Sequence, residues 1–150
     1  MKDIEGFTLI ELLITIAILA IVAMLAAPSF QSIIRANELR SGVDKVTVVL
    51  SDAKNNARLT RQTSTLKLDG SYQVDPKNKE YDLSTGVGKN VVLTSTDKAI
   101  AFLANGLIET TAKTYPVCIN IKHSKSLTTE YISITQLGFI TRSKTSCDTK

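Results

Sequence analysis

The chain has 150 residues, of which 43% are hydrophobic and 21% charged, and its formal net charge is +4. This length suits one domain, and the balance of apolar and charged residues excludes wholesale disorder. One histidine, two cysteines and no tryptophan exclude a His-rich metal centre and a zinc site with four cysteine ligands. No polar side chain occurs between residues 16 and 27, and the residues after Pro28 suffice for one modest core. The composition predicts a membrane-associated chain with a single domain.

The first element is an apolar segment at residues 7–28. As an α-helix rising 1.5 Å per residue it is roughly 30 Å long, about the hydrocarbon thickness of a bilayer. Thr8, Glu11 and Thr15 share one face of this helix. A carboxylate in a spanning helix costs roughly 2.5–3.5 kcal/mol, which makes Glu11 a candidate functional residue. A cleaved secretory signal, a plain membrane anchor and a buried helix of a soluble protein are the alternatives.

The six residues GFTLIE, from Gly6 to Glu11, resemble the processing site of type IV pilins and type II secretion pseudopilins. The motif, the apolar run behind it and its position near the N-terminus all match. The resemblance implies cleavage between Gly6 and Phe7 by prepilin peptidase, followed by N-methylation of Phe7. It also implies that Glu11 pairs with the new terminal amine of a neighbouring subunit, which would compensate the carboxylate in apolar surroundings. The acidic leader departs from the family, whose leaders are usually basic.

The resemblance divides the chain into three parts. These are a prepilin leader at residues 1–6, a transmembrane and assembly helix at 7–28, and a periplasmic pilin-like globular domain at 29–150. By the positive-inside rule, Arg35, Arg40 and Lys45 would place this domain in the cytoplasm, but large domains translocate largely regardless of charge. The resemblance implies a single pass through the inner membrane, with the domain in the periplasm and later in an extracellular pilus.

A helical pattern resumes after Pro28, whose missing backbone donor predicts a kink or a melted turn at Ala27. Apolar residues then recur in steps of three and four, which predicts an amphipathic helix to about residue 62. They are Val43, Val46, Leu50, Ala53 and Ala57. This stripe must pack on a sheet or on a coiled-coil partner.

Short strand patterns follow the helix. Strands are predicted at residues 64–68, 90–94, 99–103, 116–122, 130–135 and 138–142, and the pattern of the first strand continues with Tyr72 and Val74 after a turn at Gly70. Asn105-Gly106 and Leu137-Gly138 mark turns. The order predicts an α+β fold, in which a long N-terminal helix packs on an antiparallel β-sheet, and this layout resembles a pilin.

Two later stretches, FLANGLIETT at residues 102–111 and ISITQLGFITRS at 132–143, resemble the GspH/FimT group. This group includes FimU-like minor pilins and the minor pseudopilin of type II secretion. The resemblance implies a minor pilin that primes assembly of a type IV pilus or forms its tip complex, with other minor and major pilins as partners. A type II secretion minor pseudopilin and a DNA-binding competence pilin are the alternatives.

The two cysteines lie in the C-terminal part of the chain, Cys118 in a predicted strand and Cys147 in the tail. An even number of cysteines in an exported domain favours a disulfide, with two unpaired thiols as the alternative. Such a bond would stabilise the domain by about 3.5 kcal/mol through loop closure. These cysteines with His123 are too few for a metal site.

Residues 110–150 carry a local net charge of +4. Some members of the resembled group bind DNA through a glycine-arginine motif with a second arginine two residues later. In the matching stretch Phe139 follows Gly138 and replaces the first arginine, which leaves Arg142 and Lys144 as candidates for DNA contact. Scattered lysines usually form a solvated face.

No motif indicates catalysis. Residues 86–90, GVGKN, lack the first glycine and the hydroxyl residue of a phosphate-binding loop and predict a plain turn. His123 is expected to be an exposed residue at a strand end, and no serine or cysteine has a recognisable nucleophile setting. We expect a structural subunit without cofactor or metal.

Overall fold

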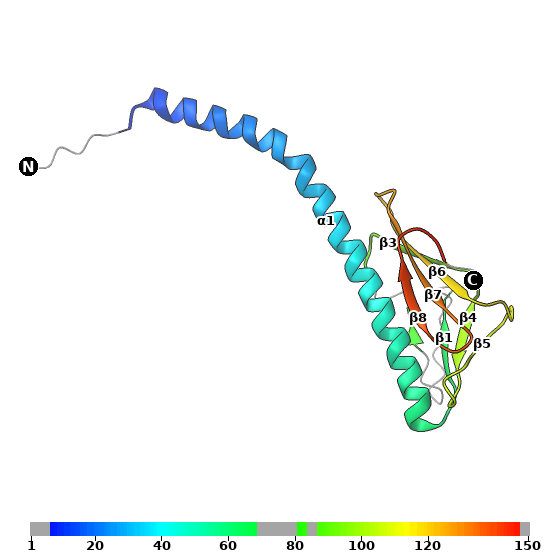
Figure 1. The fold of residues 1–150 in the computed structure, drawn as a ribbon. Coiled ribbons are helices and arrows are strands. Elements are labelled where there is room, and N and C mark those ends of the chain that lie inside the picture. Colours follow the sequence, from blue (N-terminus) through cyan, green and yellow to red (C-terminus); the bar gives the residue numbers. More distant parts are fainter. Residues whose placement is uncertain (1–6, 69–80, 84–86, 148–150) are drawn as a thin grey trace, which may run out of the picture. The chain divides into compact units, whose positions relative to one another are not determined.

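The computed structural model describes residues 7–68, 81–83 and 87–147 (Figure 1). The chain divides into two compact units, Met1–Ala36 and Asn37–Lys150. A single helix, α1 (Leu9–Thr60), begins in the first unit and ends in the second.

In the first unit the backbone of α1 remains helical through residues 26–28. No single helix in the described part of the chain is by itself long and apolar enough to cross a membrane. Leu9–Leu25 and Ser29–Thr60 satisfy that condition only together, as a bent pair, and only by length and composition. The predicted change near Pro28 is thus a bend of the helix and not a melted turn.

In the second unit the predicted apolar stripe of α1 is the helical half of the core. All five of its side chains are fully buried, and Leu39 extends the stripe by one turn towards the N-terminus. The helix ends at Thr60 because Arg61 adopts a left-handed backbone conformation with φ of 56°, the usual way to terminate a helix. The stripe therefore packs on strands of its own chain.

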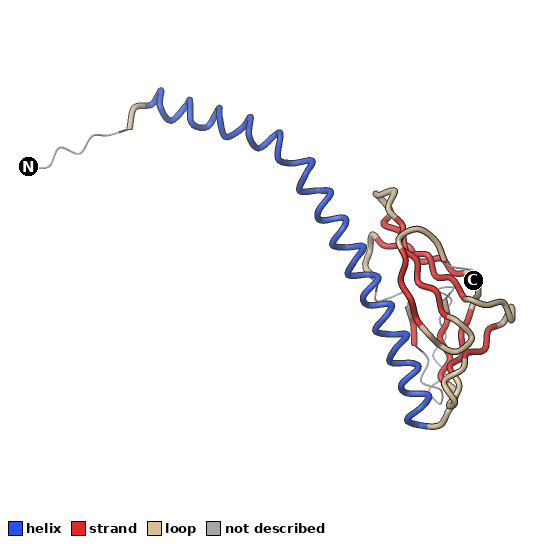
Figure 2. Tube along the Cα trace, in the orientation of Figure 1, coloured by secondary structure: helices blue, strands red, loops and turns tan. Residues whose placement is uncertain are grey.

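The strands form two four-stranded sheets, drawn in red in Figure 2. One sheet has the order β2-β1-β4-β5 and the other β3-β6-β7-β8. All neighbours are antiparallel except β1 and β2, which are parallel. The strands are β1 (Ser64–Lys67), β2 (Tyr81–Asp82), β3 (Val91–Ser95), β4 (Ala99–Phe102), β5 (Ile108–Thr110), β6 (Val117–His123), β7 (Thr129–Ile134) and β8 (Ile140–Ser143).

The predicted α+β class is confirmed, and all six predicted strands occur with shifts of one or two residues. Strands β2 and β5, which have only two and three residues, were not predicted, and the strands form two sheets instead of the expected one. Tyr72 and Val74 lie outside the described residues. Strands this short show no readable alternation of apolar and polar residues, so their pairing depends on the rest of the fold.

Both predicted glycine turns are present, and they lie side by side. Gly106 and Gly138 have positive φ values of 87° and 71°, a conformation that favours glycine. A Cβ on Gly138 would lie 2.5 Å from the carbonyl oxygen of Gly106. Lys54 near the end of α1 donates a 2.8 Å hydrogen bond to the Gly138 carbonyl. The two sheets and the C-terminal part of α1 therefore meet at this end of the unit.

Candidate functional site

The N-terminal processing motif lies partly outside the described residues, since Gly6 is not among them. Phe7 is the first described residue, precedes α1 and is 76% exposed. Every large apolar side chain from Phe7 to Leu25 is more than half exposed. This apolar helical surface has no cover within the described part of the unit, so it requires a lipid or protein environment.

Glu11 lies in the first turn of α1, where the helix macrodipole favours a carboxylate. Its backbone N–H donates a 3.3 Å hydrogen bond to the Thr8 hydroxyl. The sequence Thr8-Leu9-Ile10-Glu11 thus makes one of the two hydrogen bonds of a capping box, and its Thr-x-x-Glu pattern could have been recognised in the sequence. Within residues 7–68, 81–83 and 87–147, no cation forms an ion pair with the Glu11 carboxylate.

The other polar residue of this face needs no partner. The Thr15 hydroxyl donates a 2.8 Å hydrogen bond to the Leu12 carbonyl within the same helix. A threonine that bonds its own backbone costs little in apolar surroundings. Glu11 is therefore the one polar group of this face that still calls for a partner, among the residues that the structure describes.

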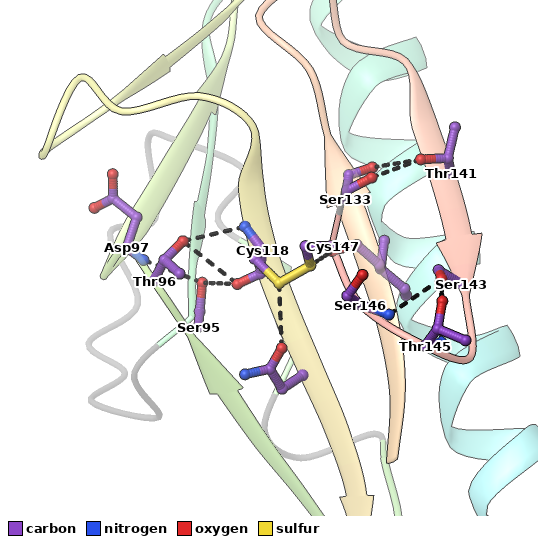
Figure 3. Close-up of a disulfide and its surroundings, with 12 residues drawn as sticks. Ser95, Thr96, Asp97, Cys118, Ser133, Thr141, Ser143, Thr145, Ser146 and Cys147 are labelled. Atoms are coloured by element: carbon purple, nitrogen blue, oxygen red, sulfur yellow. Dashed lines mark hydrogen bonds between the residues drawn. A yellow bond between two sulfur atoms is a disulfide. The ribbon is translucent and has the colours of Figure 1, made fainter. Parts of the chain in front are cut away.

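A disulfide joins Cys118 on β6 to Cys147 in the tail after β8, with their Cα atoms 5.9 Å apart (Figure 3). Cys118 lies opposite Ser133 on β7, which lies opposite Thr141 on β8. The Ser133 and Thr141 hydroxyls are 2.6 Å apart. The tail therefore crosses β7 and joins the end of β8 covalently to β6, one of the two inner strands of the sheet.

A buried carboxylate organises the end of β3 beside this disulfide. Asp97 is only 6% exposed and accepts hydrogen bonds from the N–H groups of Ala112 at 3.0 Å and Lys98 at 2.7 Å. Burial by itself would raise the pKa of Asp97, but these N–H groups hold the pKa below its ordinary value. Its role is to fix the connection between the two sheets.

The structure places Arg142 and Lys144 around one shallow hollow, with Arg40 as a third cation. The Arg142 guanidinium pairs with the Asp44 carboxylate and donates a 3.0 Å hydrogen bond to the Thr47 hydroxyl, both on α1. Glu130 lies with Arg142 and Lys144 around the same shallow hollow. Arg142 thus links β8 to the helix, and DNA contact by Arg142 and Lys144 stays a prediction.

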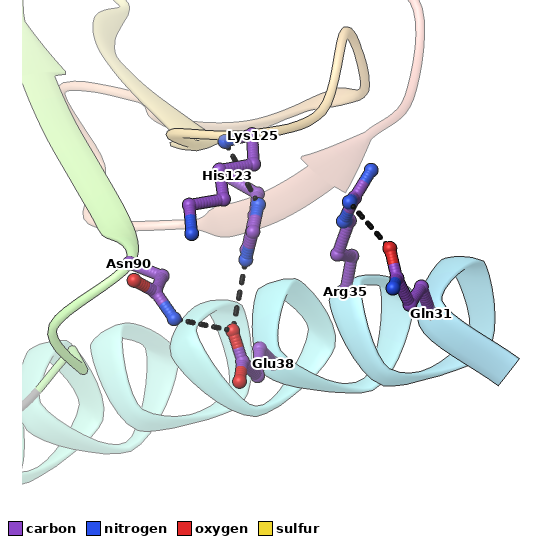
Figure 4. A network of polar contacts seen from close by, with 6 residues as sticks. All are labelled: Gln31, Arg35, Glu38, Asn90, His123 and Lys125. Atoms are coloured by element: carbon purple, nitrogen blue, oxygen red, sulfur yellow. Dashed lines mark hydrogen bonds and ion pairs between the residues drawn. The ribbon is translucent and has the colours of Figure 1, made fainter. Parts of the chain in front are cut away.

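His123 corrects an expectation from the sequence. It does end β6, but it is 1% exposed and not a surface residue. Its Nε2 lies 2.8 Å from Glu38 Oε2 on α1, and its Nδ1 accepts a 3.1 Å hydrogen bond from the Lys125 N–H (Figure 4). Nε2 therefore carries the proton that is donated to Glu38. The hydrogen bonds from His123 and Asn90 lower the pKa of Glu38.

The two remaining candidates from the sequence are the glycine-rich residues 86–90 and a metal site. Val87 is buried, and Gly88 has a positive φ of 104°. The Val91 N–H donates a 3.2 Å hydrogen bond to the Gly88 carbonyl, so the described part of residues 86–90 is a turn. Within the described residues, no group of three or more His, Cys, Asp or Glu side chains could hold a metal ion.

The chain is similar to known proteins, both in its N-terminal helix and over most of its length. The prokaryotic N-terminal methylation motif matches residues 1–27. Two probable minor fimbrial proteins of Dichelobacter nodosus are 29% and 28% identical over 117 residues, covering 76% of this chain and 70% of each relative. No solved structure matches significantly. With its methylation motif, its long N-terminal helix and its α+β unit, the chain resembles a type IV pilin-like protein.

Proposed function

We propose that this minor pilin is a structural subunit that primes assembly of a type IV pilus or forms part of its tip complex. Prepilin peptidase removes residues 1–6 by cutting between Gly6 and Phe7, and Phe7 is then N-methylated. Before assembly, residues 7–28 span the inner membrane and the globular domain, residues 29–150, lies in the periplasm. In the extracellular pilus the neighbours are other minor and major pilins.

The Glu11 carboxylate carries this proposal. It lies in the first turn of a helix whose large apolar side chains are all more than half exposed from Phe7 to Leu25. A lone charge in such surroundings is costly, whereas an ion pair with a neighbour's terminal amine neutralises it. Cleavage before Phe7 supplies that amine four residues from Glu11, about one helical turn.

The resemblance to the GspH/FimT group supports a minor rather than a major subunit. It rests on the resemblance of residues 102–111 and 132–143. The first stretch contains the Gly106 turn and β5, and the second contains half of β7 and all of β8. The resembling stretches thus coincide with the two turns that meet beside Lys54.

Two variants of the N-terminal motif test the proposal. Gly6→Ala should leave a larger, unprocessed species on an immunoblot. Glu11→Gln should give a processed protein that stays in the membrane but enters pili poorly, because the amide keeps the size of the side chain and loses its charge. Mass spectrometry of the wild-type protein from pili should show a chain that begins at methylated Phe7.

Thr8→Ala is the matched control for Glu11→Gln. It removes the hydroxyl that caps the helix but leaves the carboxylate, so it should assemble nearly normally. Normal piliation with Glu11→Gln, or an equal defect with Thr8→Ala, would contradict the ion-pair role. A wild-type chain that still begins at Met1, or that begins beyond Pro28, would overturn the whole proposal.

A further inference from the structure

We propose that Asn105 is a site of spontaneous covalent modification, at which the side-chain amide is converted to aspartate and isoaspartate at a rate set by the turn between β4 and β5. Asn105 is exposed, and it is the one asparagine of the sequence that precedes a glycine. The reaction has no part in the processing motif or in pairing with Glu11, so it does not depend on the proposed function.

The conversion consumes only water. The backbone nitrogen of Gly106 bonds to the side-chain carbonyl carbon of Asn105, and the side-chain nitrogen leaves as ammonia with the proton that the Gly106 N–H gives up. Water then opens the resulting cyclic imide at one of its two carbonyl carbons. One opening gives aspartate, and the other gives isoaspartate, in which the main chain runs through the side chain. Glycine favours the attack because no side chain shields its nitrogen and its backbone rotates freely.

The folded turn opposes this attack with two hydrogen bonds. The Gly106 N–H donates a 2.9 Å bond to the Leu103 carbonyl. The Asn105 side-chain oxygen accepts a 3.0 Å bond from the Leu107 N–H. Ring closure requires the peptide unit between Asn105 and Gly106 to rotate until its nitrogen faces the side chain, and this rotation breaks both bonds. Asn105 therefore reacts from an opened turn and not from the closed one.

Contacts with the neighbouring sheet keep the turn closed. Gly106 is buried, and a Cβ on Gly138 would lie 2.5 Å from its carbonyl oxygen. The Ile108 N–H donates a 3.0 Å hydrogen bond to the Gln136 carbonyl, and the Gly138 carbonyl accepts the bond from Lys54. Gly106 thus leaves its place only when the junction with the turn between β7 and β8 loosens. This junction controls how often Asn105 can react.

The isoaspartate product does not fit the closed turn. It inserts an additional carbon atom into the main chain ahead of Gly106 and replaces a neutral amide by a carboxylate. The N–H groups of Gly106 and Leu107 then no longer meet their two acceptors together. Because the ammonia is lost to the solvent, the amide is not restored. Each conversion to isoaspartate therefore weakens the contact between the two sheets permanently.

Tryptic peptide mapping of the full chain, aged in detergent micelles at mildly alkaline pH, measures the conversion. Cleavage after Lys98 and Lys113 releases residues 99–113, which contain Asn105 and no other asparagine or glutamine. Mass spectrometry gives the fraction of this peptide that has become an acid. Two hydrogen bonds of ordinary net strength lower the open population roughly 30-fold. The folded chain should therefore convert roughly 30-fold more slowly than the same chain unfolded in guanidinium chloride.

Gly138→Ala tests the contact between the two turns. Its Cβ pushes against the Gly106 carbonyl, so Asn105 should convert faster than in the folded wild type and more slowly than in the unfolded chain. Gly88→Ala is the matched control, because Gly88 also has a positive φ but a Cβ there meets nothing within 4 Å. At a temperature where both variants stay folded, it should leave the conversion unchanged.

Asn105→Asp is the matched control for the product, since it carries the new charge on a normal main chain. Ion exchange separates aged from unaged chains, and the isoaspartate part of the aged fraction should melt below Asn105→Asp. Equal melting would show that the turn accommodates isoaspartate. Equal conversion in folded and unfolded chains, or in Gly138→Ala and Gly88→Ala, would overturn control by the turn. An unfolded chain that keeps Asn105 intact would overturn the modification site itself.

Discussion

Two replacements of His123 distinguish how much its packing and how much its hydrogen bonds contribute to the free energy of unfolding, at the contact between α1 and β6. The imidazole is 1% exposed and makes two hydrogen bonds, one to Glu38 and one to Lys125. His123→Ala loses these bonds and leaves a cavity, so we expect a loss of roughly 3–4 kcal/mol in the free energy of unfolding. His123→Leu keeps a similar volume, and the Glu38 side chain is 41% exposed and can rehydrate. We therefore expect it to cost only about 1–2 kcal/mol.

Urea unfolding of the full chain in detergent micelles, followed by circular dichroism at pH 7, measures both variants. Asp44→Ala is the control, because the Arg142–Asp44 pair also links the helix to the sheet but leaves both side chains 41% and 54% exposed. An exposed pair contributes no more than about 1 kcal/mol. If His123→Leu cost as much as His123→Ala, the hydrogen bonds and not the packing would dominate, and the reasoning would be refuted. A neutral His123→Leu would mean that the link to Glu38 contributes nothing.

Three further predictions concern stability. Asp97→Asn should lower the free energy of unfolding by about 2 kcal/mol at pH 7. Because folding lowers the pKa of Asp97, this stabilisation is present above about pH 4 and disappears as the pH falls further. The stabilities of the wild type and the variant should therefore converge when unfolding is measured at acid pH. Replacing Cys118 and Cys147 together by serine should cost about 3.5 kcal/mol for a separation of 29 residues, and the reduced wild type should unfold at the same urea concentration as the variant. Gly138→Ala should lower the melting temperature by more than Gly88→Ala, since both have positive φ but only Gly138 meets a backbone oxygen; equal losses would show that the contact with Gly106 relaxes at no cost.

The helix and the longer strands could be predicted because each shows its own period. Steps of three and four along α1 identified five residues that are all fully buried. The alternation in β6 was also readable, and it contained a signal that was not used. Val117, Ile119 and Ile121 share the inward face with His123, so the period of two already placed the imidazole in the core. The histidine was expected to be exposed because histidine is a polar residue type. The alternation of buried and exposed positions along β6 would have predicted its burial correctly.

The division into two sheets could not be read from the sequence. Strand pairing depends on contacts between residues distant in the chain, such as Leu66 with Tyr81 and Phe102 with Ile108. The same limit applies to the candidate site. The motif at Phe7 and Glu11 is local and recognisable, whereas the partner of Arg142 lies 98 residues away on α1. The cap at Thr8 was the exception, a local signal that was present and overlooked.

The disulfide changes how the domain would respond to mechanical load. Tension applied between α1 and the end of the tail passes through the sulfur atoms and bypasses everything between Cys118 and Cys147. Strands β7 and β8 lie inside that bypassed segment and cannot be peeled away by pulling on the chain ends. At about 3.4 Å per residue, roughly 100 Å of contour length is withheld from extension. A fibre subunit built in this way gains little length under tension before the hydrogen bonds between its remaining strands have to break.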